Sequence, residues 1–259
     1  MKLDKKLKYF IHALIITVLV FLFSATGNIN FAIAAVILTF TGTFVSQYPN
    51  IRPQHIIINN LMPMHLIIGT LLSLNYFPNL GLPVKIAFIL ALGAGFYIVS
   101  LVNNVFLVVE EKEEPIPLFR VAVTWSQILF VVVTIPFFAG LFKLPSLPFV
   151  SSVIISISAF LFTLYTFWML EFDPEAKKVR GAEALFWGLF SSFIVFAASM
   201  SVSFVPTESF LRALFVSSVL MFCLNYVYGY IKNHITKRLI TEYLLITFVF
   251  FALMFIFKN

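Results

Sequence analysis

Nine apolar segments, each close to the length of a membrane-spanning helix, follow one another along this chain with short connections between them. A helix needs about 20 mostly apolar residues to cross the hydrocarbon layer of a bilayer. No polar stretch is long enough to form a domain outside the membrane. The sequence therefore predicts an all-α, polytopic transmembrane helix bundle that forms a single domain over residues 1–259. Its predicted spans are residues 9–25, 30–48, 56–77, 84–109, 117–142, 148–170, 182–205, 209–231 and 239–257.

Composition excludes a water-soluble fold. Hydrophobic residues make up 61% of the chain and charged residues 11%, whereas soluble domains carry about 25% charged residues. The net charge is +6, but the basic residues stand singly or in small groups between apolar runs. Nucleic-acid binding needs a continuous basic surface, so we expect no nucleic-acid partner. The lipid bilayer is the expected partner, and a membrane-protein partner is a further expectation.

The distribution of Lys and Arg predicts the orientation, because cytoplasmic loops of membrane proteins carry an excess of both. With the N-terminus in the cytoplasm, thirteen of them fall on the inner side and four on the outer side. The inner set is Lys2, Lys5, Lys6, Lys8, Arg52, Lys112, Arg120, Lys177, Lys178, Arg180, Lys232, Lys237 and Arg238. The outer set is Lys85, Lys143, Arg212 and Lys258. An odd number of spans then puts the C-terminus outside.

The first span has an alternative interpretation. A lysine-rich start over residues 1–8, followed by a short apolar run, is also typical of a secretory signal peptide. The exit, Phe23-Ser24-Ala25-Thr26, lacks a small-x-small cleavage site of the A-x-A type. We expect the span to be retained; its removal would leave eight spans with the same orientation.

Acidic side chains are missing from the middle of every predicted span. Each Asp and Glu falls in a loop or within about one turn of a helix end. A carboxylate at the membrane centre would indicate a functional site, so the absence of one disfavours ion-coupled transport through a midplane carboxylate. The sequence also lacks nucleotide-binding G-x-x-x-x-G-K-[ST], zinc-binding H-E-x-x-H and G-x-S-x-G motifs. The four histidines are scattered, and Cys223 is the single cysteine. We therefore expect no cofactor, no metal and no catalytic residue.

Five polar residues inside the spans form the first candidate site. They are His65, Asn103, Asn104, Gln127 and Asn225. One interpretation is helix packing, in which amides and hydroxyls form hydrogen bonds across helices. The other is a polar cavity that opens to the cytoplasm and is lined by these five residues. Pro63 lies just before His65 and should free one backbone carbonyl, which makes this the best single position for a site.

An acidic cluster at the cytoplasmic surface forms the second candidate site. It contains Glu110, Glu111, Glu113 and Glu114, with Arg120 a few residues further on. The cluster is either a solvated loop, with Arg120 reaching the headgroups, or a site for a divalent cation or a lipid substrate.

Residues 96–120 resemble a segment of a group of uncharacterised bacterial polytopic membrane proteins. The resemblance rests on Tyr97, on Asn103-Asn104-Val105-Phe106 and on Pro117-Leu118-Phe119-Arg120. It covers about a tenth of the chain. No activity attaches to that group, so the resemblance implies a location in the bacterial inner membrane and no mechanism.

These features lead to one functional hypothesis and two alternatives. The first is a non-catalytic, permease-like or accessory membrane component that handles a small or amphiphilic molecule. The second is an integral-membrane enzyme that acts on a lipid or isoprenoid at the cytoplasmic leaflet and uses the acidic cluster. The third is a structural or assembly protein of the membrane.

Overall fold

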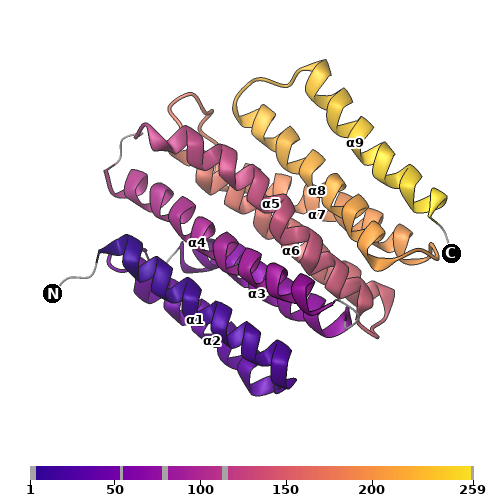
Figure 1. Cartoon of the computed structure of the whole chain (residues 1–259). Coiled ribbons are helices and arrows are strands. Elements are labelled where there is room, and N and C mark those ends of the chain that lie inside the picture. Colours follow the sequence, from indigo (N-terminus) through magenta and orange to yellow (C-terminus); the bar gives the residue numbers. More distant parts are fainter. Residues whose placement is uncertain (1–3, 53–54, 78–80, 113–115, 258–259) are drawn as a thin grey trace. The chain divides into compact units, whose positions relative to one another are not determined.

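The computed structural model of the chain describes residues 4–52, 55–77, 81–112 and 116–257. The described residues form nine α-helices and no strand, as Figure 1 shows. The helices are α1 (Lys5–Thr26), α2 (Ile29–Gln47), α3 (Ile56–Tyr76), α4 (Leu82–Lys112), α5 (Leu118–Lys143), α6 (Pro148–Glu171), α7 (Gly181–Ser203), α8 (Ser209–Ile231) and α9 (Lys237–Ile256).

The predicted fold class is confirmed. All nine helices of the described residues are long and apolar enough to cross a membrane, and each begins and ends within four residues of its predicted span. The chain is a multi-pass integral membrane protein. Some helices exceed their predicted spans because polar residues continue the helix past the hydrocarbon. The 31 residues of α4 measure about 46 Å at 1.5 Å per residue, whereas the hydrocarbon layer is about 30 Å thick.

The turn between α1 and α2 illustrates how the sequence ends one helix and begins the next. Gly27 closes α1 with a φ of 66°, in the left-handed region that favours glycine. Asn28 then caps α2, because its side chain accepts a hydrogen bond from the backbone N–H of Asn30. The two helices are therefore joined by two residues.

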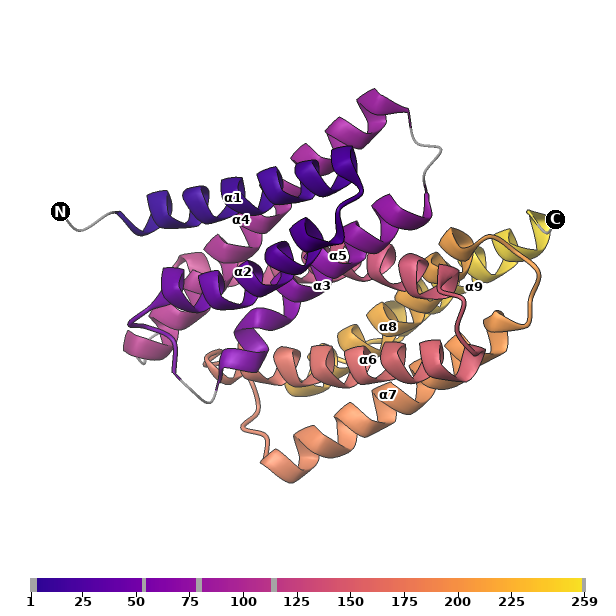
Figure 2. The same ribbon diagram turned by 90° about the horizontal axis from the view of Figure 1, so that it is seen from below.

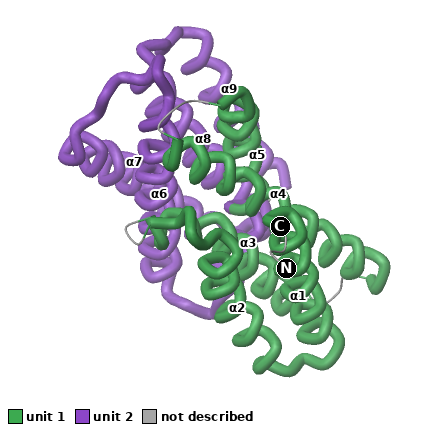
Figure 3. The backbone as a smooth tube through the Cα atoms, turned by 90° about the vertical axis from the view of Figure 1, so that its left-hand side faces the viewer, with its two compact units in different colours: residues 1–133 green, residues 134–259 purple. Residues whose placement is uncertain are grey.

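The chain divides into two compact units, residues 1–133 and 134–259, which Figure 3 colours green and purple. In unit 1, α2 packs against α1 and α3, and α4 packs against α1 and α3; Figure 2 shows α1 running beside α4. Small residues allow these close approaches. A Cβ atom at Gly42 of α2 would overlap the imidazole of His12 on α1, and one at Gly93 of α4 would overlap the hydroxyl of Thr17.

In unit 2, α6 and α7 form the closest pair, and α8 packs against α6, α7 and α9. Serine side chains join α6 and α7: the hydroxyls of Ser152 and Ser199 lie 3.0 Å apart, and the Ser192 hydroxyl donates a hydrogen bond to the Ser156 carbonyl. Helix α9 contributes little to the core, and Met254 is the one buried residue among those described in it.

Candidate functional site

Pro63 determines the role of Asn103. A helical backbone N–H normally donates to the carbonyl four residues earlier, and proline has no N–H. Pro63 therefore leaves the carbonyl of Asn59 in α3 without its partner inside the helix. The side chain of Asn103 on α4 donates a 2.8 Å hydrogen bond to this carbonyl oxygen. Both asparagines are fully buried, so Asn103 satisfies a backbone group that would otherwise be costly to bury.

The other predicted cavity residues have partners in different places. The His65 imidazole contacts the carbonyl of Leu61, and the Asn225 amide donates to the carbonyl of Met221, each within its own helix. Asn104 accepts a 2.8 Å hydrogen bond from the hydroxyl of Tyr9 on α1. Gln127 is half-buried on α5. Asn225 lies in unit 2 and the other four residues in unit 1. The cavity itself stays a prediction.

The acidic cluster holds the connection between α2 and α3. The carboxylate of Glu110 is buried and lies 3.1 Å from both the Arg52 guanidinium and the His55 imidazole. Glu111 accepts a hydrogen bond from the side-chain amide of Asn50. Both carboxylates therefore bind residues between α2 and α3, and these contacts hold Asn50, Arg52 and His55 against the end of α4.

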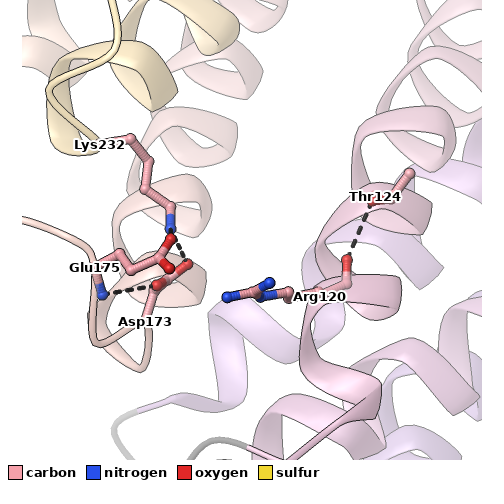
Figure 4. A network of polar contacts seen from close by, with 5 residues as sticks. All are labelled: Arg120, Thr124, Asp173, Glu175 and Lys232. Atoms are coloured by element: carbon pink, nitrogen blue, oxygen red, sulfur yellow. Dashed lines mark hydrogen bonds and ion pairs between the residues drawn. The ribbon is translucent and has the colours of Figure 1, made fainter.

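The remaining members of the predicted cluster are placed differently. Glu113 and Glu114 lie outside the described residues. Arg120 lies in the first turn of α5 and accepts, through its backbone carbonyl, a 3.1 Å hydrogen bond from Thr124 (Figure 4). Among the described residues, no group of three or more His, Cys, Asp and Glu side chains is arranged to hold a metal ion.

Unit 2 carries an ion cluster at the end of α8. The Lys232 ammonium lies 2.6 Å from the Asp173 carboxylate and 3.1 Å from that of Glu175, as Figure 4 shows. Burial disfavours the charged lysine, but the two carboxylates outweigh burial and raise the pKa of Lys232 above its ordinary value. These contacts fasten the connection between α6 and α7 to the end of α8.

A second lysine reinforces the same connection. Lys177 donates a 2.7 Å hydrogen bond to the Tyr230 hydroxyl and a 3.1 Å hydrogen bond to the Glu183 carboxylate. The hydrogen bond to Tyr230, followed by that to Glu183, raises the pKa of Lys177. Tyr230 also donates to Glu183. All five charged side chains of the two clusters, Asp173, Glu175, Lys177, Glu183 and Lys232, join the connection between α6 and α7 to a neighbouring helix, which is a structural role.

The buried face of α2 is polar. Thr39, Thr43, Ser46 and Gln47 are all buried, and we call these four residues the polar face of α2. The opposite side of the helix carries large apolar residues that are exposed, among them Ile37, Phe40, Phe44 and Val45. Thr43 and Ser46 donate hydrogen bonds to carbonyls of their own helix. The helix thus turns its apolar side outward and its polar side inward.

Several buried polar atoms of α2 and α3 have no hydrogen-bond partner within the described part of the chain. Both amide atoms of Gln47 are of this kind, as are the Thr39 hydroxyl and the side-chain oxygens of Asn59 and Asn60. Their side chains are at most 2% exposed. Buried polar groups in proteins are almost always hydrogen-bonded, so a group of unpartnered ones marks a candidate site.

Our sequence analysis did not identify these residues. The Asn59-Asn60 pair repeats the Asn103-Asn104 pattern and could have been found in the same way. The spacing of Thr39, Thr43 and Ser46 by four and three residues places them on one helix face. Neither signal says which face of α2 is buried, and that depends on the neighbouring helices.

The function must be inferred from the geometry of this site, because similarity to known proteins gives no indication of it. Comparison with protein families, curated proteins and solved structures finds no match to this chain.

Proposed function

We propose that this chain is a non-catalytic, permease-like component of the bacterial inner membrane that handles a small polar solute along the polar face of α2. The observation that carries the proposal is the side chain of Gln47. It is 1% exposed, and neither of its amide atoms has a hydrogen-bond partner among the described residues. The location in a bacterial inner membrane rests on the resemblance of residues 96–120.

The hydrophobic effect does not explain the inward polar face. Lipid tails are as apolar as leucine, so an apolar face would pack inside the bundle at no cost. Burying an amide without a hydrogen bond costs about 1–3 kcal/mol on the scale of protein mutations. Helix packing accounts for Thr43 and Ser46, which bond to their own helix. It leaves Gln47 and Thr39 unexplained, and a solute or water molecule would supply the partners that they need.

The polar face also extends in the direction that a solute path requires. Gln47 is the last residue of α2, at the end that the charge distribution predicts to be cytoplasmic. Thr39 is eight residues earlier, and eight residues of helix measure about 12 Å. The face therefore runs from the predicted cytoplasmic end of the span to a depth near its middle.

Thiol labelling tests whether water reaches this face. The matched pair is Thr43→Cys and Phe44→Cys, made after Cys223→Ala has removed the single cysteine. Thr43 is 2% exposed on the polar face, and Phe44 is 37% exposed on the outer side. Thiol reagents react with the thiolate, which forms in water and not in lipid. A charged, membrane-impermeant reagent on the cytoplasmic side should therefore label T43C and leave F44C unlabelled.

The opposite results would contradict the proposal. If neither cysteine reacts while a cysteine at exposed Lys178 does, the polar face of α2 is dry and serves packing alone. If F44C reacts faster than T43C, the outer side of α2 is the hydrated one.

A further inference from the structure

We infer that the site on α2 and α3 accepts a solute that presents hydrogen-bond donors and carries no anionic group. This inference rests on the proposed function and adds the chemical class of the solute. The residues that carry it are Gln47, Asn59 and Asn60, whose side chains are at most 2% exposed.

The orientation of the two asparagine amides is determined by their backbone partners. The side-chain nitrogen of Asn59 donates to the carbonyl of His55 at 3.1 Å, and that of Asn60 donates to the carbonyl of Ile56 at 3.0 Å. Turning either amide over would place its oxygen against a carbonyl oxygen, and two acceptors cannot bond to each other. The unpartnered atom of each residue is therefore the oxygen.

The unpartnered atoms of the site consist mainly of acceptors. Within the described residues they are the side-chain oxygens of Asn59, Asn60 and Gln47, and each amide oxygen has two lone pairs. The Gln47 nitrogen is the one amide donor in this group, and the Thr39 hydroxyl serves in either role. A solute with N–H or O–H groups satisfies such a set, whereas a carboxylate or phosphate brings further acceptors and would leave the amide oxygens unpaired.

The region where the three residues lie is defined by the helix order. Gln47 ends α2, and Asn59 and Asn60 lie in the first two turns of α3, eight residues of connection later. Helices α2 and α3 pack against each other and are consecutive, so the end of α2 and the start of α3 lie at the same end of unit 1. The hydrogen bond from Asn103 to the Asn59 backbone holds α4 at the same level.

Protection of a cysteine tests the inference. The full chain carrying C223A and T43C is labelled in membrane vesicles in the presence of methylammonium, glycerol, tetramethylammonium or acetate, with sodium chloride as the ionic-strength control. Methylammonium and glycerol present donors; tetramethylammonium has the charge without a donor, and acetate has acceptors only. We expect methylammonium, glycerol or both to slow labelling, and neither tetramethylammonium nor acetate to do so.

Two substitutions of Gln47 distinguish a charged from a neutral donor. Q47E replaces the amide nitrogen, a donor, by a second acceptor oxygen and adds a negative charge, so methylammonium should protect at a concentration about fivefold lower, because charge-assisted hydrogen bonds are about twice as strong as neutral ones. Protection by glycerol should change less. Q47L removes the acceptor oxygen and should weaken protection by either solute. F44C made in the Q47L background should stay unlabelled, which shows that the variant is folded.

The outcomes separate this inference from the proposed function. If T43C reacts and acetate or tetramethylammonium protects it as well as methylammonium does, the solute class is wrong and the hydrated path stands. The solute class is also wrong if sodium chloride alone protects T43C as well as methylammonium does, or if none of the four solutes protects it. If T43C does not react at all, the proposed function itself fails.

Discussion

The side chain of Asn103 donates a 2.8 Å hydrogen bond to the backbone carbonyl of Asn59, which Pro63 cannot bond because proline has no N–H. The helix that contains the proline and the helix that compensates for it are thus joined at one point. The same bond holds α3 and α4 together next to the unpartnered side-chain oxygens of Asn59 and Asn60, so a packing contact supports the candidate site.

Asn103→Leu should destabilise the protein by about 1–3 kcal/mol, the cost of a buried backbone group left without a partner. Pro63→Ala restores an N–H that can donate to Asn59, so the same leucine substitution should cost much less in that background. Thermal unfolding in detergent of the four proteins in this double-mutant cycle measures the difference. Equal costs in both backgrounds would show that Asn103 does not act through the carbonyl freed by Pro63.

Gly42→Ala should destabilise the contact between α1 and α2. The added methyl would overlap the His12 imidazole, which is buried and lies 3.0 Å from the carbonyl of Leu38. Overpacking of this kind typically costs about 1–3 kcal/mol. In a His12→Ala background the overlap is gone, and alanine is the better helix former by about 1 kcal/mol. The sign of the effect on thermal stability should therefore reverse; destabilisation in both backgrounds would contradict the close approach.

The Lys232 ion cluster should make stability fall at alkaline pH. Because the pKa of Lys232 is raised in the folded protein, its contribution is fully present below the pKa of an unfolded lysine, about 10.4. The contribution is lost as the pH rises through the folded value. The difference in unfolding temperature between the wild type and Lys232→Met should therefore shrink between about pH 9 and 12. Lys178→Met, at an exposed lysine of the same connection, is the control and should show no such trend.

The orientation predicted from the charges is testable with reporter fusions. Alkaline phosphatase fused after the last residue should be active and green fluorescent protein fused there should be dark, because the C-terminus is predicted to lie outside. Fusions after Lys232, in the predicted cytoplasmic connection between α8 and α9, should give the reverse pattern. Fluorescence at the C-terminus would contradict either the orientation or the span count.

The fold was predictable because membrane-spanning helices are recognised by length and apolarity alone. The start of α1 was the largest error: the span was predicted from residue 9, whereas the helix begins at Lys5. Lysines lengthen a helix beyond the membrane without any hydropathy signal. The break between the first two spans was predicted between residues 25 and 30, and there Gly27 ends α1 in the left-handed conformation that favours glycine.

The site was less predictable, and the reason is physical. In a soluble protein the apolar side of a helix faces inward, so its sequence reveals its orientation. In lipid the outer side of a helix must be apolar, whereas the inner side can be apolar or polar. The pattern of α2 therefore does not distinguish threonines that face the bundle from threonines that face the lipid and bond to their own backbone, as Thr41 does. Asn103 was identified as a polar residue of interest, but its partner, Asn59, depends on how α3 and α4 pack.

Solute flux through the purified protein is the most direct test of a solute path along α2. Radiolabelled methylammonium or glycerol is added outside proteoliposomes that contain the full chain, and its uptake is measured. The controls are protein-free vesicles and vesicles that contain Thr43→Trp, a substitution that fills the polar face of α2. We expect faster uptake of at least one solute by the wild type, and uptake at the protein-free rate for T43W. Wild-type uptake equal to that of protein-free vesicles for both solutes would contradict it.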